Sequence, residues 1–144
     1  MPAISRHFFC GCCVKQVMRF IPTKVHGILD YLYVLVLFFT PTIFHFSTNG
    51  APTLIMDVVS STVLVYSTFT KYELGISKYL PMRMHLLLDI IVGIFLAASP
   101  WIFGFARYVY VPHLFFGLFA VVAALLTKKS SERIERSTYS ENLK

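Results

Sequence analysis

The chain has 144 residues and a formal net charge of +6. Hydrophobic residues make up 56% of it, aromatic residues 16% and charged residues only 14%, which leaves too little polar surface for a soluble domain. This composition argues against a disordered chain, a nucleic-acid-binding protein and a small secreted protein held together by disulfides.

An N-terminal segment, residues 1–19, precedes the first long apolar run. Four of its side chains are candidates for metal binding or, in the case of cysteine, for lipid attachment: His7, Cys10, Cys12 and Cys13. An odd number of crowded cysteines predicts no disulfide framework. These side chains could bind a soft metal ion or accept a palmitoyl group, but their spacing is not that of a zinc ligand pair.

The apolar residues then fall into four runs, as helices that cross a bilayer require. The runs cover about residues 22–39, 52–69, 81–98 and 112–127. Each has roughly 16–18 residues before its aromatic flanks, near the short end of the spanning range. We therefore predict an all-α integral membrane protein with four transmembrane helices.

The distribution of Lys and Arg predicts which way these helices cross. All but one of the 13 basic residues lie near the two ends of the chain or near the linker at residues 71–78, and Arg107 is the exception. Lys and Arg near helix ends resist translocation. Both termini, including the polar tail at 128–144, and the linker are therefore predicted to be cytoplasmic, and the loops at about 40–51 and 99–111 external.

The second half of the chain repeats the first, residues 20–70 corresponding to residues 79–127. The offset is 59 through the first helix of each repeat, and six of the seven prolines fall in matched pairs. Thr40-Pro41-Thr42 thereby corresponds to Ser99-Pro100-Trp101. Because each repeat is a two-helix hairpin entering from the same side, we predict a pseudo-two-fold axis along the membrane normal.

The tripeptide Ser99-Pro100-Trp101, which follows a helix bearing His-x-x-x-Asp, resembles the SPW-repeat family of small bacterial integral membrane proteins. The resemblance covers about residues 18–128, with Thr42 in place of the first tryptophan. It implies a multi-pass fold in the bacterial inner (plasma) membrane and brings no activity with it. It also implies a natural start at Met18, with residues 1–17 expected to be an extension or a misassigned start.

The candidate functional residues are two matched pairs, His26 with Asp30 and His85 with Asp89. Each pair has the i, i+4 spacing that places both side chains on one helix face. The carboxylates lie roughly 12 Å along their helices. An isolated carboxylate at such depth costs about 2.5–3.5 kcal/mol on insertion scales, so these groups should face the bundle interior and find partners. The pseudo-two-fold axis would bring the two pairs together.

Three interpretations of these pairs remain open. In the first, the protein is non-enzymatic and associates with itself or with a larger membrane complex, and the pairs hydrogen-bond to hold its repeats together. In the second, His26 and His85 ligate a metal ion or bracket a b-type haem, and the aspartates orient the imidazoles. In the third, the four groups form a proton or ion relay in a small conduit.

Lys24 and Arg83 occupy the same position of the two repeats, at helix N-termini that favour anions. They could contact a phosphate, a lipid head group or an anionic substrate, although cytoplasmic helix starts are expected to carry basic residues in any case. Asp57 has no repeat partner, because Gly117 stands opposite it, and a helix-dipole role suffices. Small residues, Gly93 and Ala97 on the third helix and Gly117, Ala120 and Ala124 on the fourth, are expected to allow close backbone approach.

Overall fold

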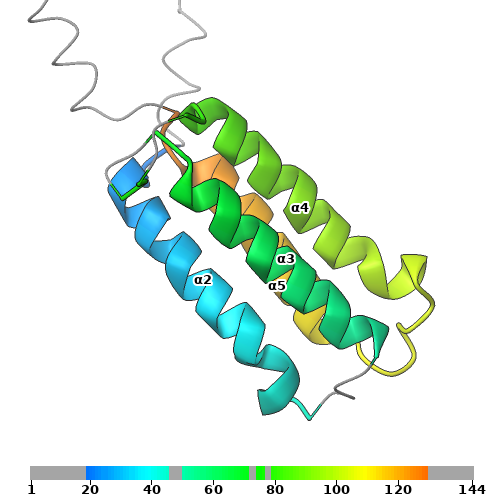
Figure 1. Cartoon of the computed structure of the whole chain (residues 1–144). Helices are drawn as coiled ribbons and strands as arrows, with labels where there is room; N and C mark the ends of the chain where they lie inside the picture. Colours follow the sequence, from blue (N-terminus) through cyan, green and yellow to red (C-terminus); the bar gives the residue numbers. More distant parts are fainter. Residues whose placement is uncertain (1–18, 46–49, 72–73, 77–78, 130–144) are drawn as a thin grey trace, which may run out of the picture.

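The computed structural model describes residues 19–45, 50–71, 74–76 and 79–129. In these ranges the chain is all-helical, with four helices side by side and no strand (Figure 1): α2 (Thr23–Ile43), α3 (Ala51–Thr68), α4 (Met82–Ile102) and α5 (Val111–Leu126). The predicted all-α class is confirmed. The expectations for the cysteines and His7, and for nearly all of the polar tail, concern residues outside the described part of the chain.

Prolines set the starts of all four helices. Pro22 and Pro81 immediately precede α2 and α4 with extended backbone, and Pro52 and Pro112 lie in the first turns of α3 and α5. The first backbone N–H groups of a helix have no partner within it, so a residue without an N–H loses nothing there. The sequence predicted these starts correctly.

The ends of α2 and α4 differ from the prediction. The helices were expected to stop near residues 39 and 98, but they continue to Ile43 and Ile102. Pro41 and Pro100 therefore lie inside the last turn of each helix. A proline in this position removes a single hydrogen bond, and the residue after each helix still donates its N–H to the carbonyl just before the proline.

Three of the helices have the dimensions of membrane spans. Among the described residues, α2, α3 and α4 are long and apolar enough to cross a bilayer, with 21, 18 and 21 residues, whereas α5 is apolar but has 16. Large apolar side chains cover the outer surface, among them Leu35, Phe38, Leu54, Ile91 and Phe115. Many of the most buried side chains are polar, including Thr40, Ser67, His85, Ser99 and Thr127. An apolar exterior that encloses buried polar groups suits a lipid solvent.

Helices α4 and α5 pack closely through the two predicted glycines. A methyl group built on Gly117 would lie 2.5 Å from the carbonyl oxygen of Gly93 and 2.5 Å from the backbone nitrogen of Ala97. Only glycine allows the two backbones to approach this closely. The apolar core lies between all four helices and includes Leu37, Met56, Val59, Val63 and Leu96.

The backbone also joins the two hairpins at one end of the bundle. Ile21, just before α2, pairs with Thr127, just after α5, and Thr70, just after α3, pairs with Leu80, just before α4. Both pairings are parallel bridges of one residue pair each. They hold the starts of α2 and α4 against the ends of α5 and α3, which positions the side chains described next.

Candidate functional site

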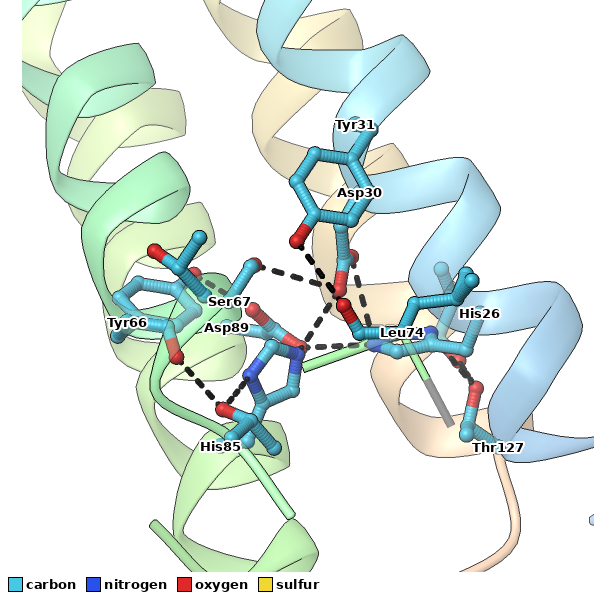
Figure 2. A network of polar contacts seen from close by, with 12 residues as sticks. His26, Asp30, Tyr31, Tyr66, Ser67, Leu74, His85, Asp89 and Thr127 are labelled. Atoms are coloured by element: carbon cyan, nitrogen blue, oxygen red, sulfur yellow. Dashed lines mark hydrogen bonds and ion pairs between the residues drawn. The ribbon is translucent and has the colours of Figure 1, made fainter. Parts of the chain in front are cut away.

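The four predicted side chains form one buried cluster, called here the His/Asp cluster and consisting of His26, Asp30, His85 and Asp89 (Figure 2). α2 supplies the first pair and α4 the second, each from the turns near its start. Side-chain exposure is 2% and 0% for the two histidines and 10% and 6% for the two aspartates. One nitrogen or oxygen from each residue lies within 4.8 Å of all the others.

The shortest contacts in the cluster run between helices. His26 Nε2 lies 3.0 Å from Asp89 Oδ2, and His85 Nε2 lies 3.0 Å from Asp30 Oδ2. Within each helix the separations are longer, 3.5 Å from His26 Nε2 to Asp30 Oδ1 and 3.3 Å from His85 Nε2 to Asp89 Oδ2. Each imidazole therefore faces both carboxylates through the same ring nitrogen.

The other nitrogen of each imidazole contacts a threonine that follows a neighbouring helix. His85 Nδ1 lies 2.9 Å from the hydroxyl of Thr70, and His26 Nδ1 lies 2.9 Å from the hydroxyl of Thr127. Each threonine in turn donates its hydroxyl to the carbonyl four residues earlier, at 2.6 Å, in Tyr66 and Ala123 respectively.

This arrangement places a proton on Nδ1 of both histidines. A hydroxyl has one hydrogen, and Thr70 and Thr127 give theirs to backbone carbonyls, so each threonine oxygen accepts a hydrogen bond from Nδ1–H. Nε2 of each ring then faces carboxylate oxygens. Because two lone pairs repel at such a distance, a proton or a cation must lie between Nε2 and those oxygens.

Helix α3 holds the carboxylates from a third direction. The hydroxyl of Tyr66 donates to Asp89 Oδ1 at 2.5 Å, and the hydroxyl of Ser67 donates to Asp30 Oδ2 at 3.5 Å. The Tyr66 ring also lies edge-on to the imidazole of His85, with centroids 5.1 Å apart. With the threonines after α3 and α5, side chains from or adjoining all four helices therefore meet at the cluster.

Sequence reasoning missed these supporting residues. Matching Pro52 with Pro112 gives an offset of 60 for the second helix of each repeat, which places Thr127 opposite Ser67. In the structure Thr127 and Thr70 play corresponding roles, at an offset of 57. α3 is two residues longer than α5, and Thr70 lies two residues beyond its helix whereas Thr127 lies one residue beyond its own. A comparison without a gap therefore could not align the two threonines.

A small cavity of about 20 Å³ adjoins the cluster. His26, Asp30 and Asp89 line its polar side, while the apolar side includes Val63, Val92, Phe119 and Ala120. This volume holds about one water molecule. Tyr33 reaches the cavity from α2 and donates its hydroxyl to the carbonyl of Phe116 in α5, at 3.2 Å.

The remaining predicted residues lie outside the cluster. Lys24 and Arg83 are exposed in the first turns of α2 and α4 and do not line the cavity. Asp57 lies half-buried in α3, and its backbone carbonyl accepts hydrogen bonds from the hydroxyls of Ser60 and Ser61. The proposed anion contacts and the cluster are therefore separate features.

A comparison with protein-family models now identifies the family. The model of the SPW repeat domain matches residues 24–127, most of the chain and all four helices except for the first residue of α2. The chain belongs to the SPW repeat domain family. No curated protein and no solved structure matches it significantly. Membership confirms the resemblance drawn from the sequence and, with the apolar helices, assigns the chain to multi-pass membrane proteins.

The tripeptide that names the SPW repeat lies at the end of the bundle opposite the cluster. Ser99 and Pro100 are buried in the last turns of α4, where the serine hydroxyl donates to the carbonyl of Leu96 at 2.8 Å. Trp101 is 57% exposed and lies beside Tyr110, with ring centroids 6.1 Å apart. In the first repeat, Thr40 and Pro41 are buried in the same way. The tryptophan side chain thus extends outward, as an interfacial anchor would.

Proposed function

We propose that this SPW repeat protein is a non-enzymatic structural or interaction component of the bacterial inner membrane. In this proposal the His/Asp cluster holds its two hairpins together, and the outer surface of the bundle packs against lipid, a second copy of the chain or a larger membrane complex. The reciprocal contacts between His26 and Asp89 and between His85 and Asp30 carry the proposal. Each contact joins the first helix of one hairpin to the first helix of the other.

The proposed topology has four transmembrane helices in two hairpins, related by a pseudo-two-fold axis, with both termini in the cytoplasm. The helix α5 is the short member, since 16 residues extend about 24 Å against a hydrocarbon core of about 30 Å. Its close packing along α4 through Gly117 supports a span that thins the bilayer locally. The matched roles of Thr70 and Thr127 support the pseudo-symmetry.

The haem and conduit interpretations fit the geometry less well. A porphyrin is far larger than the cavity of about 20 Å³ beside the cluster, so a haem would require the helices to separate. A conduit needs a polar path along the whole bundle. In the half of the bundle away from the cluster, the buried apolar side chains Leu37, Met56 and Leu96 interrupt such a path.

A double-mutant cycle tests the proposed interhelical role. We expect His26→Gln and Asp89→Asn to be coupled by about 1 kcal/mol in the free energy of unfolding, because the two side chains contact each other across helices. The measurement is unfolding in mixed micelles followed by circular dichroism.

A control cycle pairs His26→Gln with Asp57→Asn. Asp57 lies near the start of α3, at the other end of the bundle, so coupling below about 0.5 kcal/mol is expected there. Equal coupling in the two cycles, or none between His26 and Asp89, would contradict the proposal that the cluster joins the hairpins.

A further inference from the structure

We propose that the His/Asp cluster binds one divalent transition-metal ion of the Zn²⁺ class, with His26, Asp30, His85 and Asp89 all as direct ligands. The inference rests on the proposed function in one respect, since it requires the cluster to face inward between the two hairpins. It goes further by naming a ligand and by giving the aspartates a different role. From the sequence, the aspartates were expected to orient the imidazoles. In this proposal their carboxylates coordinate the ion directly.

The spacing of the four side chains matches a tetrahedral site. Zinc binds histidine nitrogen and carboxylate oxygen at about 2.0–2.2 Å, so neighbouring ligand atoms of a tetrahedron lie about 3.4 Å apart. The four separations between Nε2 atoms and carboxylate oxygens are 3.0, 3.0, 3.3 and 3.5 Å, with Asp30 facing His85 through Oδ2 and His26 through Oδ1. One ligand atom from each of the four residues lies within 4.8 Å of the others, so an ion at the centre requires small shifts of these atoms and no movement of the helices.

The orientation of the imidazoles is the orientation that metal ligation requires. A ligating imidazole directs one nitrogen at the metal and donates the other N–H to a fixed acceptor. Thr70 and Thr127 provide such acceptors, and both are themselves held by hydrogen bonds to backbone carbonyls. Both Nε2 lone pairs are thereby directed at the space that the carboxylates share.

Charge balance also favours a dication. Two neutral imidazoles and two carboxylates carry a charge of about −2, which is costly in a bilayer and which one divalent ion cancels. Imidazole nitrogen favours zinc and related transition metals, whereas Mg²⁺ and Ca²⁺ prefer oxygen ligands. Four protein ligands complete a tetrahedral shell, so the ion would have a structural role and would fasten α2 to α4.

The first experiment measures metal binding to the full chain. Cys10, Cys12 and Cys13 are replaced by serine to remove competing thiolates, the purified protein is stripped with a chelator, and ZnCl₂ is titrated by calorimetry. We expect saturation at about one Zn²⁺ per chain, no comparable binding of Mg²⁺, and four-coordinate ligand-field bands when Co²⁺ is used instead. Failure to bind Zn²⁺, or equal affinity for Mg²⁺, would overturn the inference.

Matched variants assign the ligands. Asp30→Asn with Asp89→Asn preserves side-chain shape but removes both anionic ligands, so Zn²⁺ binding should be lost, whereas Asp57→Asn removes a carboxylate outside the cluster and should leave it unchanged. Thr70→Val removes the acceptor for His85 Nδ1–H and should weaken the Zn²⁺ affinity about 10- to 100-fold. Full binding by the double variant would overturn the assignment.

The two proposals can fail separately. If the full chain binds no Zn²⁺ but His26 and Asp89 remain coupled in the unfolding cycle, the metal site is refuted and the hydrogen-bonded junction between the hairpins stands. If neither result is obtained, both proposals fall. Binding of Zn²⁺ that stabilises wild-type protein, and not the double variant, against thermal unfolding supports the metal site even where the variant is less stable.

Discussion

At the scale of single residues, the buried histidines form hydrogen bonds with side chains that follow a neighbouring helix. Thr70 and Thr127 show this most directly. Thr70→Val and Thr127→Val keep the shape of the side chain but leave the buried Nδ1–H of His85 or His26 without its acceptor. We expect each to lower the free energy of unfolding of the metal-free chain by about 2 kcal/mol. Chemical unfolding in micelles, in the presence of a chelator, measures the change.

The chain offers a matched control for this prediction. Thr62 also donates its hydroxyl to the carbonyl four residues earlier, at 2.7 Å, but it is exposed on α3 and contacts no histidine. Thr62→Val should therefore change stability by less than about 0.5 kcal/mol. A loss at Thr62 as large as that at Thr70 would mean that the backbone contact matters and the contact with the imidazole does not.

At the same scale, the sequence predicted the members of the cluster but not their supports. His26 and Asp30 are recognisable because i, i+4 spacing and a matched second copy are properties of the sequence itself. Thr70 and Thr127 lie beyond the ends of their helices, and their roles depend on the backbone bridges that bring those ends to α4 and α2. Local periodicity carries no information about such contacts.

At the scale of elements, α4 and α5 pack closely because Gly93 and Gly117, which face each other across the contact, have no side chains. Gly117→Ala would place a methyl group 2.5 Å from backbone atoms of α4, which cannot rotate away, so the two helices must separate. We expect a loss of about 2 kcal/mol in the free energy of unfolding. The measurement is thermal or chemical unfolding in detergent, with helix content followed by circular dichroism.

Val122→Ile is the control for the glycine, since it adds a methylene group to an exposed position of the same helix. It should leave stability within about 0.5 kcal/mol of the wild type. If Gly117→Ala is equally neutral, α5 does not pack on α4 as closely as described. That result would also remove the support that this contact gives to α5 as a membrane span.

The elements were predicted better at their starts than at their ends. The runs predicted to begin at residues 22, 52, 81 and 112 begin within one residue of the observed helices, because each starts at a proline, whose missing N–H is dispensable there. The first and third runs were predicted to stop near residues 39 and 98, yet each helix continues for two residues beyond Pro41 or Pro100. A proline near a C-terminus loses a single hydrogen bond, and the buried packing of both prolines compensates for it.

At the scale of the whole molecule, the cluster and the repeat motif occupy opposite ends of the bundle. The cluster and the backbone bridges lie near the starts of α2 and α4, while Trp101 lies where α4 ends. One end is thus fixed by polar contacts and the other by packing and an exposed aromatic ring. This polarity agrees with the charge distribution, because Arg107 alone among the Lys and Arg residues that the structure describes lies near the Trp101 end.

That distribution predicts the orientation of the whole molecule, and two single cysteines test it. In a chain without Cys10, Cys12 and Cys13, we introduce either Lys71→Cys or Arg107→Cys, both at exposed positions outside the helices. A membrane-impermeant maleimide applied to intact cells, or to spheroplasts where an outer membrane is present, should label only Arg107→Cys, because basic residues flanking helices stay in the cytoplasm. Lys71→Cys should react only after permeabilisation, which also shows that both thiols are reactive. The reverse pattern would invert the proposed topology. Labelling of both from outside would mean that an even number of membrane crossings separates them, so that α4, the helix between them, would not span the membrane.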